Sequence, residues 1–340
     1  MNNPTLAITI GDISGIGPEI TAKTLLLHPE LREICVPIAY GDANSLRHGC
    51  EVAGLDPNSV HVLTSPSDAT NDPNRIEVIQ VGPELERVEL GKVSATAGDG
   101  AYRFVVAACG DAKKNLVQGI VTAPLNKEAM HAGGHLWPGH TEILAHEFGV
   151  ENYSMILSAD DLFLFHLTTH QSLKSAVDSC TPDRTYNVIK LAAALGKANG
   201  HPEWTIGVCG INPHAGENRL FGDEDQDQLL PGIQRAQEEG INVTGPLPAD
   251  ALIPAAVKGK YNLVIACYHD QGHAPFKAVY GDNGVNITSG LPVVRVSVDH
   301  GTAFDIAGKG IAREESLVLA TRRAAELSSG WADVWTVASS

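Results

Sequence analysis

Short, continuous apolar runs recur along the chain, and most of them precede a helical pattern. The first run, LAITI, leads into the glycine-rich segment GDISGIGPE and then into a helical pattern that starts at Ile20. A run without polar alternation is typical of a strand buried on both faces, as in a parallel sheet covered by helices. Because strands alternate with helices almost throughout, we expect an α/β fold.

The chain is long enough for two lobes, each with its own core, because it has 340 residues. We expect a first α/β lobe formed by 1–125 plus 285–340 and a second formed by 126–284, sharing or exchanging segments. Further strands are expected in VPIAYG, SVHVL, IEVIQV, GIVTAP, YSMILS, LFLFHL, TIGVCG, NLVIAC and LPVVRVSV. Helices are expected at 96–118, 182–199, 225–239 and 314–328.

Charge and composition exclude several classes of protein. The formal net charge is −16, and no cluster of Lys and Arg could follow a phosphate backbone, which argues against nucleic-acid binding. No apolar run approaches the ~18 residues of a membrane span, and no signal peptide is recognisable. Six scattered cysteines without a C-x-x-C pair indicate a reduced, cytoplasmic protein.

Three histidines each follow an apolar run: His170 in LFLFHLTTH, His214 in TIGVCGINPH and His269 in NLVIACYHDQG. Ligands gather at the carboxyl ends of parallel strands, so these side chains could converge on one metal ion. The alternative is coincidence, because the chain has 14 histidines. The long spacings between the three match no local zinc signature.

Two further segments have features of an anion site. GDISGIGPE could hold a phosphate with backbone amides at a helix start, or it could be only a tight turn. His140 and Thr141 stand at the entry to the apparent helix TEILAHEF, where free amides and the positive end of the helix dipole favour an anion. Thr141 could equally be a simple N-cap, and both interpretations can hold together.

The densest polar segment is YHDQGHAPFK, in which Asp270 follows His269 and could orient it as a hydrogen-bond acceptor. Arg295 interrupts the apolar run LPVVRVSV. A charge in such a strand is costly unless it is paired or faces a ligand, so we expect Arg295 at a site. Asp250 in GPLPAD is a further candidate.

At these residues the chain resembles the 4-hydroxythreonine-4-phosphate dehydrogenase family along nearly its full length. The segments that carry the resemblance are GDISGIGPEI, TAPLNK, PGHTE, TTH, NPHAGE, GPLPAD, YHDQG, GVNITSGLPVVR and SVDHGTAFDIAGKG. Their order and content make a chance similarity implausible. The resemblance implies an α/β/α fold like that of isocitrate and isopropylmalate dehydrogenases, without the Rossmann fingerprint.

The resemblance also implies the chemistry and the residues that carry it. A divalent metal (Zn²⁺, Co²⁺, Mg²⁺ or Mn²⁺) would be held by His170, His214 and His269, which act in catalysis through it. Asp250 and Lys277 would be catalytic. The phosphorylated substrate would contact these two and His140, Thr141, Asn286 and Arg295. The reaction would be oxidation of a 4-phosphorylated 3-hydroxy acid by NAD or NADP, with decarboxylation of the 3-oxo acid, in pyridoxal phosphate biosynthesis. The family works as a homodimer with active sites at the subunit interface.

Some segments depart from the biosynthetic pattern. Ile13-Ser14 stand where Pro-Ala is usual, and the segment from His273 to Phe276 replaces a more aliphatic stretch. These changes resemble a catabolic branch that oxidises D-threonate or D-erythronate 4-phosphate. An aromatic cis-dihydrodiol dehydrogenase and a phosphate acyltransferase are the remaining alternatives. The sequence leaves the general base, the metal and the choice of NAD or NADP undecided.

Overall fold

The computed structural model of the protein describes residues 3–338, and the chain forms two compact units. The first contains 1–150 and 293–329, and the second contains 151–292 and the segment from 330. We expected boundaries at 125 and 285 and a carboxyl terminus wholly in the first lobe. The difference arises because two helices after residue 126 pack on a helix of the first unit, whereas the last helix packs on the second.

The strands of the first unit form a fully parallel sheet in the order β3-β4-β2-β1-β5-β12. All parallel strands end at the same edge, so the segments that follow β1, β5 and β12 come together there. The strands are β1 (Thr5–Thr9), β2 (Val36–Gly41), β3 (Val60–Leu63), β4 (Ile76–Gln80), β5 (Gly119–Thr122) and β12 (Val294–Ser297).

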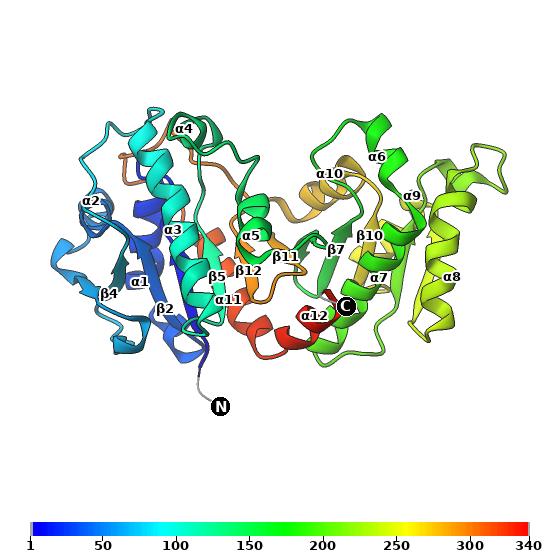
Figure 1. The fold of residues 1–340 in the computed structure, drawn as a ribbon, viewed down its shortest axis with the longest axis horizontal. Coiled ribbons are helices and arrows are strands. Elements are labelled where there is room, and N and C mark those ends of the chain that lie inside the picture. The colour runs from blue at the N-terminus through cyan, green and yellow to red at the C-terminus, as the bar shows by residue number, and fades with distance from the viewer. Residues whose placement is uncertain (1–2, 339–340) are drawn as a thin grey trace. The chain divides into compact units, whose positions relative to one another are not determined.

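The helices of the first unit cover both faces of this sheet (Figure 1). Helix α1 connects β1 to β2, and α3 connects β4 to β5, in opposite directions along the sheet. Because both crossovers are right-handed, the two helices lie on opposite faces. The helices are α1 (Gly17–Leu27), α2 (Ala43–Ala53), α3 (Ala95–Lys113), α4 (Lys127–Ala132), α5 (His140–Phe148) and α11 (Glu315–Ser328), with short 3₁₀ turns η1 (Pro29–Glu33), η2 (Pro57–Ser59) and η3 (Pro66–Asp68).

The sheet of the second unit is mixed, with the order β11-β6-β7-β10-β8-β9. β6 is antiparallel to both neighbours, whereas the others pair in parallel. The short turn at Asp160, which has φ 48°, can join β6 to β7 only as a hairpin. The strands are β6 (Ser154–Ala159), β7 (Leu162–His166), β8 (Ile206–Cys209), β9 (Val243–Leu247), β10 (Leu263–Ala266) and β11 (Val285–Ser289).

The helices of the second unit include several that the sequence did not indicate, among them α10 (His269–Tyr280) in the polar segment YHDQGHAPFK. The helix expected at 225–239 begins instead with a π-helical turn, η5 (Asp225–Leu229). The others are α6 (Leu173–Ser179), α7 (Pro182–Ala198), α8 (Leu230–Glu238), α9 (Ala249–Val257) and α12 (Trp331–Ala338), with 3₁₀ turns η4 (Pro213–Gly216) and η6 (Gly281–Asn283).

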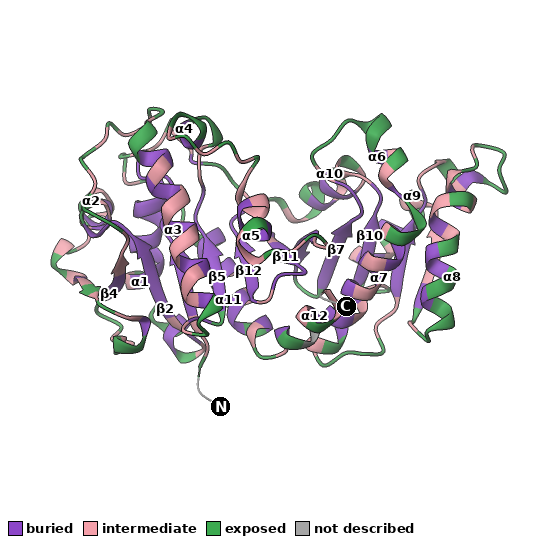
Figure 2. Ribbon diagram, in the orientation of Figure 1, coloured by how far each residue is buried: buried purple, intermediate pink, exposed green. Residues whose placement is uncertain are grey.

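Burial follows the pattern of the apolar runs, with the strands buried and the outer helix faces exposed in both units (Figure 2). In the second unit Leu164, Val264 and Cys209 pack against Leu252 and Phe276, which lie on α9 and α10. This core fixes the position of the segment that starts at His269. Across residues 3–338, the helices are too short or too polar to span a membrane.

Candidate functional site

The first cluster of predicted site residues lies at the start of α5 in the first unit. The helix begins at His140, with Gly139 as N-cap and no capping side chain. Thr141 is therefore within the first turn, and our interpretation of it as the N-cap is corrected. Because no side chain caps this end, its backbone N–H groups remain available to an anion.

His140 is held as a neutral imidazole. Burial lowers its pKa well below the ordinary value of 6.5, and the positive charges of Arg295 and Lys127 lower it further. Its Nε2 is enclosed and has no hydrogen-bond partner within residues 3–338. A buried polar atom without a partner is costly, so this nitrogen indicates the place of a ligand that would bond to it.

Arg295 lies on β12 and is only 3% exposed. Its Nη2 donates to the Thr122 hydroxyl at 2.7 Å, across the pairing of β12 with β5. Burial lowers its pKa to about 10, which still leaves a full positive charge at neutral pH. The helix start, the neutral imidazole and the buried guanidinium together suit a phosphate group.

The segment GDISGIGPE forms a tight turn between β1 and α1. Gly11 has φ 69°, and a Cβ there would overlap Pro124 O. The backbone N–H of Asp12 donates to the same oxygen at 3.0 Å. Asp12 Oδ1 accepts from the Ser14 backbone N–H at 2.8 Å, and burial raises the Asp12 pKa to about 6. The glycines are thus needed for close packing, as the simpler interpretation of this segment predicted.

In the second unit, His170 and His269 face one another across a hollow. Their ring centroids are 5.9 Å apart, and both line a cavity of about 470 Å³. His269 Nδ1 lies 2.7 Å from Asp270 Oδ1. The carboxylate can only accept, so Nδ1 carries the proton and Nε2 of His269 has a free lone pair. This is the arrangement in which a carboxylate orients a metal-binding histidine.

Two further histidines, which the sequence did not single out as partners, connect this hollow to the core. His273 stacks on His269 with ring centroids 3.7 Å apart, and its Nδ1 lies 3.1 Å from His166 Nε2. His166 Nδ1 faces the Met155 carbonyl oxygen at 3.2 Å. Both nitrogens of His166 are thus engaged, so the nearby His170 is the better candidate for a metal ligand. The periodicity of α10, with His273 one turn after His269, was the signal available in the sequence.

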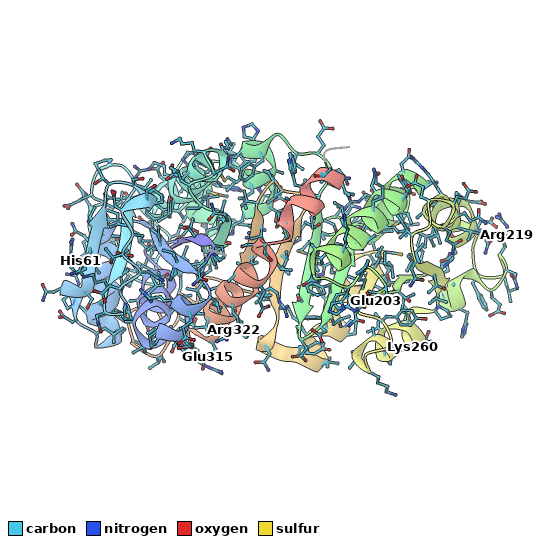
Figure 3. All side chains as sticks on the ribbon, turned by 90° about the horizontal axis from the view of Figure 1, so that it is seen from below. His61, Glu203, Arg219, Lys260, Glu315 and Arg322 are labelled. Atoms are coloured by element: carbon cyan, nitrogen blue, oxygen red, sulfur yellow. The ribbon has the colours of Figure 1, made fainter. Side chains whose placement is uncertain are left out.

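His214 lies in a loop whose backbone is unusual. Every residue from His214 to Arg219 has a positive φ, between 42° and 78°. Buried Asp225 holds the start of this loop, since its carboxylate accepts from the backbone N–H of Ile211 at 2.8 Å and of Asn212 at 3.1 Å. At its outer side Arg219 projects from the unit (Figure 3) and pairs with exposed carboxylates. A strained loop with a buried anchor is typical of a functional segment.

The remaining predicted residues occupy separate elements of the second unit. Asp250 is exposed in the first turn of α9, Lys277 is exposed on α10, and Asn286 lies on β11 opposite Leu157. Within residues 3–338, no three His, Cys, Asp or Glu side chains are grouped as a metal site. The single chain therefore brings His170 and His269 together but leaves His214 outside the pair.

The comparisons with known proteins agree with one another. Residues 33–324 match the family described as "Pyridoxal phosphate biosynthetic protein PdxA". D-threonate 4-phosphate dehydrogenase of Bordetella bronchiseptica is 59% identical over 337 residues, 99% of this chain and 96% of that protein. 4-Hydroxythreonine-4-phosphate dehydrogenase of Beijerinckia indica is 42% identical over 312 residues, 92% of this chain and 91% of that protein.

Solved structures give the same result for the fold. A 4-hydroxythreonine-4-phosphate dehydrogenase from Burkholderia phymatum superposes with a TM-score of 0.85 at 43% identity, covering 96% of this chain and 99% of that one. A β-decarboxylating dehydrogenase from Thermococcus kodakarensis has a TM-score of 0.50 at 13% identity, covering 94% of this chain and 82% of that one, which shows the fold alone. The expected α/β fold is thereby confirmed.

Proposed function

The chain belongs to the PdxA family and is an oxidoreductase, and from this premise we propose that it oxidises a 4-phosphorylated 3-hydroxy acid with NAD or NADP. Carbon C3 loses a hydride to the nicotinamide, and its hydroxyl group loses a proton to a base. The resulting 3-oxo acid then releases CO₂ and takes up a proton at C2, which gives a phosphorylated ketone one carbon shorter.

The observation that carries this proposal is the enclosed Nε2 of His140, which has no partner within residues 3–338. An N–H at this position would donate to a phosphate oxygen, while the charge of Arg295 balances the phosphate. Thr141, in the same first helical turn, would add a hydroxyl donor. The protein carries a net charge of −16 and would repel a phosphorylated substrate. Such a substrate therefore needs local donors and a positive charge, which His140 and Arg295 would provide.

A divalent metal ion fits the second unit. His269 has its Nδ1 proton bound to Asp270, and His170 faces it across the hollow. We place His214 as the third ligand, in a homodimer whose active site takes residues from both chains. When bound, the metal supplies a Lewis acid that favours the alkoxide at C3 and the enolate after CO₂ loss. Imidazole ligands suit Zn²⁺ or Co²⁺, and nearby carboxylates also admit Mg²⁺ or Mn²⁺.

Asp250, Lys277 and Asn286 are further residues that we propose to contact the substrate. Lys277 would hold a proton and a positive charge close to the reacting oxygen, Asp250 would take part in proton transfer, and Asn286 would orient the substrate by hydrogen bonding. We further propose that the enzyme works in the cytoplasm, which agrees with six free, buried cysteines.

We propose D-threonate 4-phosphate as the first substrate and 4-hydroxythreonine 4-phosphate as the second. The 59% identity with the Bordetella enzyme favours this order over the 42% identity with the Beijerinckia enzyme. The test is NADH or NADPH formation by the purified enzyme with both compounds and with unphosphorylated D-threonate. We expect the highest kcat/KM for D-threonate 4-phosphate and at least ~100-fold less for D-threonate, because two charge-assisted bonds are lost. Equal use of D-threonate would contradict the phosphate site.

A further inference from the structure

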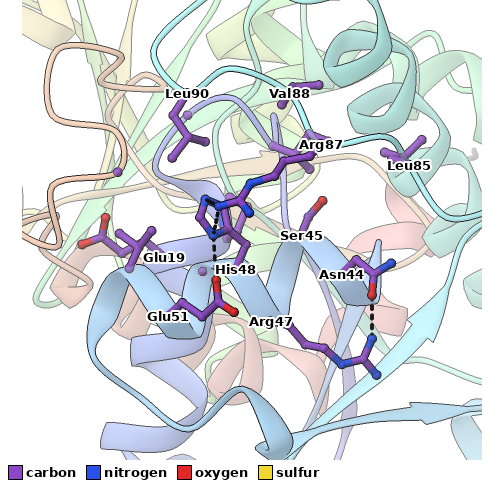
Figure 4. A pocket seen from close by; sticks show the side chains of 16 residues that line it. Glu19, Asn44, Ser45, Arg47, His48, Glu51, Leu85, Arg87, Val88 and Leu90 are labelled. Atoms are coloured by element: carbon purple, nitrogen blue, oxygen red, sulfur yellow. Dashed lines mark hydrogen bonds and ion pairs between the residues drawn. The ribbon is translucent and has the colours of Figure 1, made fainter.

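A separate cavity in the first unit has no part in the sites described so far. It has a volume of about 390 Å³ and lies between the start of α1, helix α2 and the segment 85–90 (Figure 4). Neither His140 nor Arg295 lines it. Its position beside the carboxyl ends of β1 and β2 is where open α/β sheets bind ligands.

The cavity is lined both by apolar side chains and by planar polar groups. Leu85, Val88 and Leu90 contribute the apolar side chains. On α2, the imidazole of His48 lies beside the Arg87 guanidinium, whose Nη2 is 3.1 Å from Nδ1 and 3.2 Å from Nε2. A planar heterocycle suits such a lining, because it can stack on imidazole and guanidinium groups while it covers apolar surface.

A buried acceptor lies at the same cavity. Glu19 lines it and is 3% exposed. Its Oε1 accepts from Lys23 Nζ at 2.8 Å and from the Ala312 backbone N–H at 2.9 Å. Oε2 is buried and has no hydrogen-bond partner among residues 3–338. A ribose hydroxyl is a neutral donor that would satisfy this oxygen without adding charge.

The cavity also has features that suit phosphate groups. Gly15 of the turn before α1 lines it, and α1 begins without a capping side chain. Arg47 and Arg87 bring two positive charges to the cavity, which the carboxylates of Glu19 and Glu51 also line. A ligand with a planar base, a ribose and a diphosphate would therefore meet a matching group at each position.

We propose that this α1–α2 cavity binds the adenosine diphosphate portion of the nicotinamide cofactor, an inference that rests on the proposed dehydrogenase function. The base would lie between Leu90 and the His48–Arg87 pair, and the ribose would donate to Glu19 Oε2. The chain has no G-x-G-x-x-G fingerprint. The cofactor therefore needs a site of another kind, and this cavity supplies one.

The test measures binding of ADP-ribose and of NADH to the full-length, metal-free protein, by calorimetry and by NADH fluorescence. Arg87→Ala removes the guanidinium, and Val52→Phe fills the cavity from α2 without removing a charge. We expect both variants to bind ADP-ribose at least ~10-fold more weakly than the wild type, with unchanged circular dichroism. Two variants of the same unit serve as controls: Arg75→Ala, at an exposed position, and His61→Ala, at a partly exposed position (Figure 3). Both should bind ADP-ribose as the wild type does.

Wild-type affinity in both cavity variants would overturn the inference. Binding of ADP-ribose that does not compete with NADH would also overturn it, because the cavity would then hold an effector. These results are independent of turnover. A protein that binds ADP-ribose in this cavity but oxidises no phosphorylated hydroxy acid would refute the proposed function and retain the cofactor site.

Discussion

His273 Nδ1 lies 3.1 Å from His166 Nε2, and this contact fixes the tautomers of both rings. His166 must donate from Nδ1, because the Met155 carbonyl oxygen at 3.2 Å can only accept. Its Nε2 therefore accepts from His273 Nδ1, which leaves the lone pair of His273 on Nε2. Burial lowers the pKa of His166 to about 3 and of His273 to about 4, so both stay neutral.

This pair supports the proposed metal ligand, because His273 stacks on His269 at 3.7 Å. We predict that His273→Leu destabilises the protein by about 1–3 kcal/mol, since His166 Nε2 loses its buried donor. Loss of the stacking ring should weaken Co²⁺ binding about 10-fold, measured by the cobalt absorption spectrum. His201→Leu is the matched control, because His201 is an exposed histidine that stacks on Trp204. Equal effects in the two variants would contradict the support role.

His140→Asn should weaken phosphate recognition. Asparagine cannot reach the position of Nε2, so one hydrogen bond to an anion is lost, which corresponds to about 1.5–3 kcal/mol, or roughly 10- to 100-fold in the dissociation constant. The measurement is inhibition by inorganic phosphate together with KM for the phosphorylated substrate. His146→Asn, at an exposed position of the same helix α5, should leave both unchanged. An unchanged phosphate affinity in His140→Asn would remove the main support for the phosphate site.

Asp12 should make stability depend on pH in a direction unusual for a carboxyl group. Its pKa is raised from 3.8 to about 6 by burial, so the folded state binds more protons than the unfolded state between these values. Its contribution to stability is therefore present below pH ~4 and is lost as the pH rises to about 6. We predict that the free energy of unfolding of Asp12→Asn, measured by urea unfolding, rises by roughly 2 kcal/mol relative to that of the wild type between pH 4 and pH 7. A constant difference across this range would show that Asp12 titrates normally.

Asp225 should affect metal binding through the loop of His214. In the wild type, the Asp225 carboxylate accepts hydrogen bonds from the backbone N–H groups of Ile211 and Asn212. Asp225→Asn replaces one carboxylate oxygen with an NH₂ group, which cannot accept such a bond. We expect Co²⁺ affinity to fall at least ~10-fold, while ADP-ribose binding in the first unit is unchanged. Asp223→Asn, which removes only an exposed ion pair with Arg219, is the control and should change stability by less than ~1 kcal/mol. Unchanged metal affinity in Asp225→Asn would exclude His214 from the site.

The sequence predicted most of the strands, most clearly where they are continuous apolar runs such as LFLFHL and NLVIAC. It missed β9 (VTGPL) and β11 (VNITS), which are not continuous apolar runs. It did not predict that β6 is antiparallel, since this depends on the hairpin at Asp160 and not on the composition of the strand. Helix α10 was missed because its polar residues obscured the helical spacing of His269, His273 and Lys277. Pro275 within it also argued against a helix.

The roles of the predicted site residues stay predictions. The placement of Arg295 at a site followed from the cost of a charge in an apolar strand, and its hydrogen bond to Thr122 agrees with that argument. The roles of Asp225 and His166 could not be predicted, because each acts through contacts with residues far away in the sequence. For the same reason the cavity lined by Glu19 and His48 had no signature: its walls come from four separate segments.

The most direct test of the proposed function follows NADH or NADPH and CO₂ together in one reaction with D-threonate 4-phosphate. We predict that the metal-depleted enzyme is inactive, and that added Zn²⁺, Co²⁺, Mg²⁺ or Mn²⁺ restores activity with one CO₂ released for each reduced nicotinamide formed. Full activity after exhaustive chelation, or reduced nicotinamide without CO₂, would contradict a metal-dependent oxidative decarboxylation.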